Sequence, residues 1–239
     1  MKLIDLKGIT KVFNDGRKEI EALKKTDFSV EAGEFTAIIG PSGSGKSTLL
    51  TIIGGLQTPT EGEVFINEDT FSELTEKERA KMRFKEIGFI LQASNLIPFL
   101  TIKDQLKLVN KIEKSSFESE RVTSLLSNLG IEDLMDKYPS DLSGGERQRA
   151  AIARALYHGP SVILADEPTA SLDTERAYEV VKILSRETKE NNKATIMVTH
   201  DERLTDFCDS VYVMKDGVLT KKDDSERNKR DAYDIGGEE

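Results

Sequence analysis

The chain has 239 residues, 37% of them hydrophobic and 32% charged, which is enough to bury the core of one large domain. Its formal net charge of −9 argues against a nucleic-acid binder, because such proteins carry a strongly basic surface. The single cysteine, Cys208, excludes an internal disulfide and a cysteine-built metal site, and no apolar run approaches the roughly 20 residues of a membrane span. The N-terminus lacks the apolar run of a signal peptide, so we expect a soluble protein of the reducing cytosol.

The N-terminal part of the chain predicts strands around a glycine-rich loop. Residues 2–12 and 20–30 are expected to form two strands, with a turn at 13–16 between them. The apolar run 35–39 is typical of a buried strand, and residues 47–53 predict a helix. The loop between this strand and this helix is the first candidate site.

The loop from Gly40 to Thr48 fits the pattern G-x-x-x-x-G-K-[ST] of a phosphate-binding loop. Its glycines let backbone N–H groups turn inward as an anion-binding nest, at which the next helix also points its positive end. Lys46 adds a positive charge for the phosphates, and the Ser47 hydroxyl is a ligand for Mg²⁺. A flexible Gly/Ser turn is the alternative, but strand, loop, Lys-Ser pair and helix all agree. The expected nucleotide-binding residues are Gly40, Ser42, Gly43, Ser44, Gly45, Lys46, Ser47 and Thr48.

Phe13 is an aromatic residue just before a turn, upstream of this loop. An adenine ring stacked on it would gain ~1–3 kcal/mol. An ordinary core aromatic of an edge strand explains the residue equally well, so the residues alone leave both interpretations open.

The middle of the chain changes from strands to helices. A strand at 63–66, a helix at 75–84 and an apolar strand at 87–91 come first, and the last of these ends at Gln92. From about 96 to 158 few β-branched runs occur, which indicates a helical subdomain inserted into an α/β core. Its predicted helices are 101–113, 117–129, a short 131–137 and 144–157.

The C-terminal part returns to the α/β pattern. Two buried parallel strands at 162–165 and 194–198 flank a helix at 174–190, and a short helix at 202–207 precedes a hairpin over 211–219. The tail 221–239 contains five Lys or Arg and seven Asp or Glu residues, too few apolar groups to fold by itself. It is expected to be a solvated, partly disordered tail or, alternatively, an element that docks a partner.

Carboxylates follow one of these buried strands directly. Asp166 and Glu167 end the strand 162–165, where parallel sheets hold their ligands. We assign Asp166 to Mg²⁺, through water, and Glu167 to the base that deprotonates water. A solvated acidic pair is the alternative. His200 and Gln92 end two further strands and could reach the same ligand, although each could equally be structural.

A second candidate anion site lies at Leu142–Glu146, with the sequence Leu-Ser-Gly-Gly-Glu. Ser143 can cap the predicted helix and leave its first N–H groups free for an anion. A single nucleotide can use both anion sites if the second site comes from another copy of the chain.

In this order the motifs resemble those of the ATP-binding subunits of ABC transporters. The matching segments are the Walker A loop Gly40–Thr48, the Q-loop residue Gln92, the signature Leu142–Glu146 followed by Arg-Gln-Arg, the Walker B strand with its catalytic glutamate 162–167, the D-loop 171–173 and the H-loop residue His200. The resemblance covers roughly residues 1–220. It implies an α/β P-loop NTPase with a RecA-like core of mostly parallel sheet, an antiparallel β-subdomain and an inserted helical subdomain. The core and β-subdomain would be 1–92 and 159–220, and the helical subdomain 93–158.

The resemblance also implies the chemistry. Two ATP molecules with Mg²⁺ would lie in a head-to-tail homodimer, between Walker A of one copy and the signature of the other. The implied catalytic residues are Glu167, His200 and Gln92; the metal ligands are Ser47, Gln92 and Asp166; the signature residues acting across the dimer are Ser143, Gly144, Gly145 and Glu146; and Asp173 links the two sites. Phe13 matches the adenine-stacking position of the family, where tyrosine is commoner.

Within this family, residues 74–101 look like those of the MacB/LolD group, with the segment 96–101 most like the Gram-positive haem- and peptide-efflux branch. The group includes ATPases for lipoprotein release and for efflux of macrolides, antimicrobial peptides or haem. A membrane permease would contact the chain near Gln92–Thr101, holding it on the cytoplasmic face of the cell membrane. The alternative is an ATPase that regulates an extracellular enzyme, as cell-division relatives do. Nucleic-acid relatives are disfavoured because the chain has no long coiled-coil insertion, zinc site or second cassette.

Overall fold

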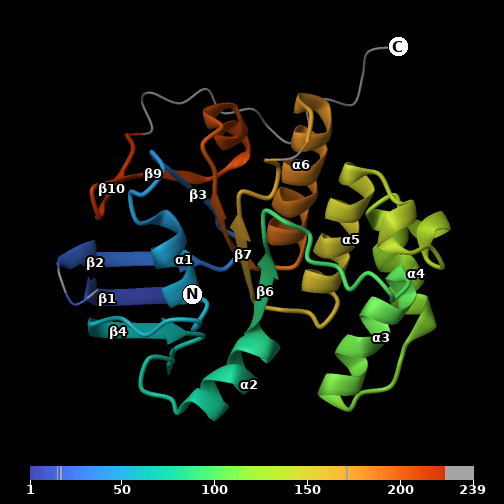
Figure 1. Cartoon of the computed structure of the whole chain (residues 1–239), viewed down its shortest axis with the longest axis horizontal. Coiled ribbons are helices and arrows are strands. Elements are labelled where there is room, and N and C mark those ends of the chain that lie inside the picture. The colour runs from blue at the N-terminus through green and yellow to red at the C-terminus, as the bar shows by residue number, and fades with distance from the viewer. Residues whose placement is uncertain (15, 17, 171, 224–239) are drawn as a thin grey trace.

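A computed structural model describes residues 1–14, 16, 18–170 and 172–223 of the chain. Figure 1 shows two sheets on one side of the molecule and a group of helices on the other. The predicted tail beyond residue 223 and Ser171 of the D-loop lie outside the described residues. The described residues contain no helix that is both long and apolar enough to cross a bilayer.

A six-stranded sheet forms the centre, in the order β10-β9-β3-β8-β7-β6. The strands from β9 to β6 are parallel, and only β10 runs antiparallel to its neighbour. All residues of β3 and β8 are buried, which explains why their sequences are continuous apolar runs rather than alternating ones. The strands are β3 (Phe35–Ile39), β6 (Ile87–Ile90), β7 (Val162–Asp166), β8 (Ala194–Val198), β9 (Ser210–Lys215) and β10 (Val218–Lys221).

A second, antiparallel sheet has the order β2-β1-β4-β5. Its strands are β1 (Lys2–Asn14), β2 (Glu19–Glu31), β4 (Glu61–Ile66) and β5 (Asp69–Thr70). Helix α1 (Lys46–Ile53) shares one apolar cluster with both sheets, through residues such as Leu49 and Ile53. The loop before α1 is therefore held between the two sheets (Figure 1).

The helices on the other side are α3 (Ile102–Glu113), α4 (Ser119–Asn128) and α5 (Gly144–Leu156). Helix α5 packs closely against β6, because a Cβ on Gly88 would lie 2.5 Å from the Ala155 carbonyl oxygen. The two remaining α-helices are α2 (Glu76–Glu86), just before β6, and α6 (Thr174–Glu190), which joins β7 to β8. The fold is thus the predicted α/β P-loop architecture, whereas the subdomain boundaries at residues 92 and 159 stay a prediction.

Several short elements differ from the sequence-based expectation. The helix expected at 131–137 is only a 3₁₀ turn at Glu132–Leu134, whereas the short helix expected at 202–207 is present as a 3₁₀ helix, Glu202–Phe207. A further 3₁₀ turn at Pro139–Asp141 and the strand β5 were not predicted. These elements have two to six residues, too few to show a periodic pattern of burial.

Candidate nucleotide site

The glycine-rich loop between β3 and α1 is packed so tightly that two of its glycines admit no side chain. Gly40 has φ 149°, and a Cβ there would lie 2.1 Å from the Met214 carbonyl oxygen in β9. Gly45 has φ 109°, and its Cβ would lie 2.5 Å from the Ala22 carbonyl oxygen in β2. Both sheets therefore fix the loop's backbone, and glycine is required where they meet it.

The loop concentrates polar groups that lack ordinary partners. Lys46 is only 8% exposed, and its Nζ donates to the carbonyl oxygens of Gly40 at 2.7 Å and Pro41 at 2.8 Å. The Ser44 Oγ is buried without a hydrogen-bond partner among the described residues. A phosphate group in the loop would neutralise the Lys46 ammonium, so the residues present fit a nucleotide.

A pocket of about 450 Å³ opens on this loop and brings together most of the predicted site residues. It is hollowed where β3, β7 and β8 end, as expected for a parallel sheet. Ala22 and Val198 also line it, although nothing in the sequence pattern singled them out. The predicted residues that line it are Gly40, Ser42, Gly43, Gly45, Lys46, Ser47, Thr48, Gln92, Asp166, Glu167 and His200.

Oxygen donors for a metal meet at one side of this pocket. The Ser47 hydroxyl donates to Asp166 Oδ1 at 3.4 Å, and the Gln92 side chain lines the same pocket. Hydroxyl, amide and carboxylate oxygens are the ligands that Mg²⁺ prefers. Within the described ranges no group of three or more His, Cys, Asp or Glu side chains could hold a metal by itself. The donor set therefore fits an ion whose coordination is completed by substrate phosphates and water.

Glu167 has a strained backbone and a fixed side chain. Its φ is 48°, in the left-handed region that non-glycine residues occupy at a cost of about 1–3 kcal/mol. Its N–H donates to the Val198 carbonyl oxygen at 2.9 Å, and its Oε2 lies 2.8 Å from His200 Nδ1. The last residue of β8 thus holds the backbone of Glu167, and His200, just beyond that strand, holds its carboxylate in the pocket.

At the predicted second anion site Ser143 caps α5 as expected, and it does so through a capping box with Glu146. The Ser143 Oγ accepts from the Glu146 N–H, and the Ser143 N–H donates to the Glu146 carboxylate. These two N–H groups are therefore occupied, and those of Gly144 and Gly145 are the ones without an intrahelical partner. The bond from the Ser143 backbone N–H lowers the pKa of Glu146, which keeps this carboxylate charged. The pattern S-x-x-E was readable in the sequence and would have predicted the box.

The Ser143 hydroxyl and backbone N–H both interact with the Glu146 carboxylate, so the N–H groups of Gly144 and Gly145 are the donors left for an external oxygen. However, none of the residues Ser143–Glu146 lines the pocket of the glycine-rich loop. Gly144 instead borders a separate hollow of about 520 Å³ together with Gln92, Ser94 and Arg147. One copy of the chain therefore does not bring its two anion sites together.

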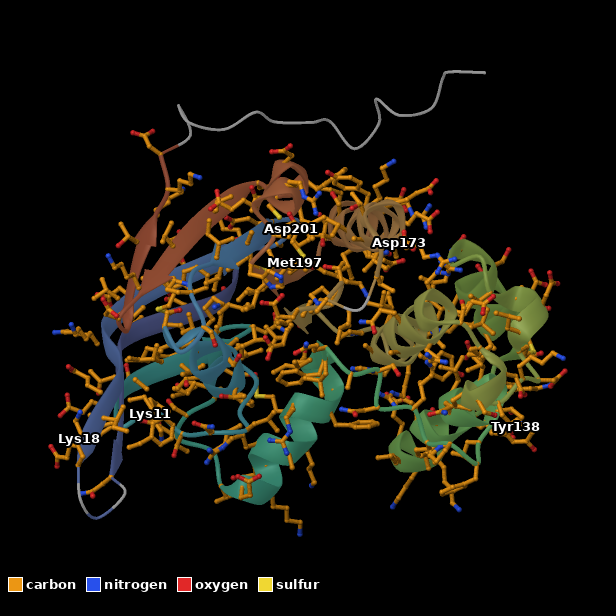
Figure 2. All side chains as sticks on the ribbon, turned by 45° about the horizontal axis from the view of Figure 1, so that its top comes forward. Lys11, Lys18, Tyr138, Asp173, Met197 and Asp201 are labelled. Carbon is orange, nitrogen blue, oxygen red and sulfur yellow. The ribbon has the colours of Figure 1, made fainter. Side chains whose placement is uncertain are left out.

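Three further predicted residues also lie outside the pocket's lining: Ser44, Phe13 and Asp173. Phe13 is in β1 with its side chain 38% exposed, and the Lys11 Nζ lies 5.1 Å from its ring centroid. This exposure argues against the core interpretation and leaves a ring face that an adenine can use. Asp173, labelled in Figure 2, caps α6, because its Oδ1 accepts from the Arg176 backbone N–H at 3.0 Å. Its Oδ2 also lies 3.5 Å from Nε of the Arg176 side chain.

Comparison with known proteins gives consistent results for family, sequence and structure. A family model described as ABC transporter matches residues 23–170. The putative hemin import ATP-binding protein HrtA of Staphylococcus haemolyticus is 45% identical over 219 residues, covering 90% of this chain and 98% of that protein. The HrtA protein of Staphylococcus aureus strain MRSA252 is also 45% identical, over 217 residues with the same coverage.

Two solved structures have the same fold. The ATP-binding cassette MJ0796, in a dimeric post-hydrolysis state with ADP and Pi, superposes with a TM-score of 0.83 at 38% identity and covers 91% of this chain and 98% of its own. The protein cbiO1 of Clostridium perfringens, part of the transporter complex cbiONQ, has a TM-score of 0.82 at 32% identity and covers 92% and 87%. The similarity therefore extends over nearly the whole described chain.

Proposed function

The chain belongs to the ABC transporter family, and we propose that it hydrolyses ATP at the loop Gly40–Thr48 to drive a haem-exporting permease. As an ATP-binding cassette it is an ATPase that uses ATP with Mg²⁺, dimerises and acts together with a membrane permease. The proposal concerns which residues perform these steps, what the permease carries and where the chain lies in the cell.

The loop pocket holds the groups needed to bind and cleave the γ-phosphate. Lys46 and the loop N–H groups would bind the phosphates, while Ser47, Gln92 and Asp166 would hold the magnesium ion. When bound, Mg²⁺ neutralises charge on the phosphate oxygens. The Glu167 carboxylate would remove a proton from the attacking water, and His200, 2.8 Å away, would hold that carboxylate in position. The products are ADP and phosphate.

One observation supports a site shared between two copies. The motif Ser143–Glu146 has two N–H groups without an intrahelical partner at a helix start, yet it does not border the pocket of its own chain. We assign Ser143, Gly144 and Gly145 to the γ-phosphate bound by the partner copy. Asp173, the residue that caps α6, would link the two sites. The dimeric state of the MJ0796 structures supports this arrangement.

The names of the relatives and an exposed segment support the proposed cargo and location. Relatives named putative hemin import ATP-binding protein indicate haem as the cargo of the permease, and the resemblance to the efflux branch indicates export. Phe99 is 75% exposed in the segment Gln92–Thr101 that we assign to the permease's cytoplasmic helix. Binding there would place the chain on the inner face of the cell membrane.

Mixing two inactive variants tests the shared site. Lys46→Ala removes the phosphate cation, and Ser143→Arg blocks the second anion site, so each variant alone should lack ATP hydrolysis. A mixed dimer contains one intact site, built from the loop of the Ser143→Arg copy and the signature of the Lys46→Ala copy. Hydrolysis should therefore reappear when the two are combined. A mixture as inactive as its components would contradict the proposal.

A further inference from the structure

The segment that follows β6 is held by side chains of the helical side of the molecule. Gln148 Nε2 in α5 donates to the Leu91 carbonyl oxygen at 3.4 Å. Gln105 in α3 is buried and exchanges two bonds with the Ile97 backbone, donating to its oxygen at 3.0 Å and accepting from its N–H at 3.1 Å. We call residues 91–97 the Gln92 segment. All three of these hydrogen bonds attach it to helices α3 and α5.

The strongest attachment of this segment is Arg154 in α5. Its Nη1 donates to the Asn95 carbonyl oxygen at 2.7 Å, and its Nη2 donates to the Ser94 carbonyl oxygen at 3.1 Å. The planar guanidinium thus binds two successive carbonyl oxygens, a geometry that lysine cannot reproduce. The turn that brings these oxygens together includes Asn95 at φ 46°.

Placing the Arg154 guanidinium here costs desolvation free energy, which a purely structural contact would not require. Burial lowers the pKa of the Arg154 guanidinium, and no charged group among the described residues offsets that effect. Arg154 is partly buried, and a cation held there by carbonyl oxygens gives up part of its hydration, which an apolar side chain would not have had. An apolar residue would pack α5 with less cost, so the specific hydrogen bonds to Ser94 and Asn95 are what this arginine provides.

Helix α5 and the Gln92 segment each carry a functional group at one end. The helix begins at the signature residue Gly144, and Arg154 lies three turns further along the same rigid element. The segment places Gln92 in the nucleotide pocket and continues into the residues assigned to the permease. Arg154 therefore connects the signature helix to the segment that enters the pocket.

We propose that Arg154 is a positioning residue, which fixes the Gln92 segment to the signature helix so that both move as one unit. This rests on the proposed function, because it makes the Gln92 position in the pocket depend on where α5 lies. We call the two hydrogen bonds of Arg154 to Ser94 and Asn95 the Arg154 clamp. Without this clamp, ATP would still bind the Lys46 loop, but Gln92 would no longer be held beside Asp166 and Glu167. The loss would therefore fall on turnover rather than on binding.

The test compares Arg154→Met with Arg154→Lys and with the matched control Arg186→Met in the full-length chain. The Arg186 side chain also donates to a carbonyl oxygen, that of Asn128 at 3.0 Å. Neither of these two residues belongs to the Gln92 segment. The readouts are kcat and KM for Mg-ATP, the melting temperature, and hydrogen exchange of the amides of residues 91–97.

Arg154→Met should lower kcat on the order of tenfold with KM for ATP nearly unchanged, as expected for lost charge-assisted hydrogen bonds. Its amides in the segment should exchange faster, Arg154→Lys should recover part of both effects, and Arg186→Met should show neither. Unchanged exchange in the segment of folded Arg154→Met, or equal losses in Arg186→Met, would overturn the clamp. If the wild-type chain hydrolysed no ATP, the proposed function would fail, while the exchange data would still decide whether the clamp exists.

Discussion

The Nδ1 atom of His200 lies 2.8 Å from Oε2 of Glu167, although the two residues come from the ends of different strands. Strands β7 and β8 are neighbours and parallel, so residues just beyond their carboxyl ends meet. Glu167 adopts a left-handed backbone there; its N–H donates to the Val198 carbonyl oxygen of β8, and its carboxylate contacts His200. At the edge of the nucleotide pocket, Glu167 is the assigned base and His200 is the residue that positions its carboxylate.

Replacing His200 tests this pair directly. We expect His200→Ala to lower kcat for ATP about 10²-fold or more, because the Glu167 carboxylate loses the partner that positions it. ATP binding should change little, since the loop contacts stay intact. Measurement of kcat and of ATP affinity by fluorescence or calorimetry distinguishes the two. The control is His158→Ala, which lies outside the pocket and should leave kcat unchanged; a normal kcat in His200→Ala would exclude the assigned role.

Phe13 tests the adenine side of the site. Its exposed ring is expected to stack on the base, so Phe13→Ala should weaken ATP binding by ~1–3 kcal/mol, whereas Phe13→Tyr should bind normally. Inorganic tripolyphosphate, which has no base, is the matched probe for the phosphate loop. Its affinity should be the same for wild type and Phe13→Ala. Equal weakening for ATP and tripolyphosphate would mean that Phe13 acts through the loop and not through the base.

The His158 side chain should make the stability of the folded chain depend on pH. Burial is the main cause that lowers its pKa below the ordinary value, and its ring stacks on Phe84 at 5.7 Å between centroids. Because the folded state favours the neutral imidazole, its stabilisation is present above the unfolded pKa of ~6.5 and is lost as pH falls through the folded value. His158→Phe should remove this loss. The melting temperature of wild type minus that of His158→Phe should therefore fall between pH 8 and pH 5, and a constant difference would contradict the assignment.

Much of the fold could be predicted because its long elements have regular burial. The helix predicted at 174–190 is α6 with the same ends, and the two apolar runs at 35–39 and 194–198 are fully buried strands. Convergence of Gln92, Asp166, Glu167 and His200 on the loop followed from one physical rule, that the ends of parallel strands share an edge.

Other features of the site leave no pattern in the sequence. The left-handed conformation of Glu167 was not predictable, since glutamate gives no signal for positive φ. The bonds of Arg154 and Gln105 go to backbone carbonyl oxygens, which every residue carries, so no residue type marks the partner. Ala22 and Val198 line the pocket only because of how the two sheets pack.

ATP is proposed to bind between two copies of the chain. The variant Glu167→Gln shows whether this dimer forms. It keeps the shape of the side chain but cannot take a proton from water, so ATP should stay bound and hold the dimer closed. We predict a dimer by size-exclusion chromatography with light scattering in Mg-ATP, and a monomer with ADP or after the additional change Ser143→Arg. A Glu167→Gln chain that binds Mg-ATP yet remains monomeric would contradict the account.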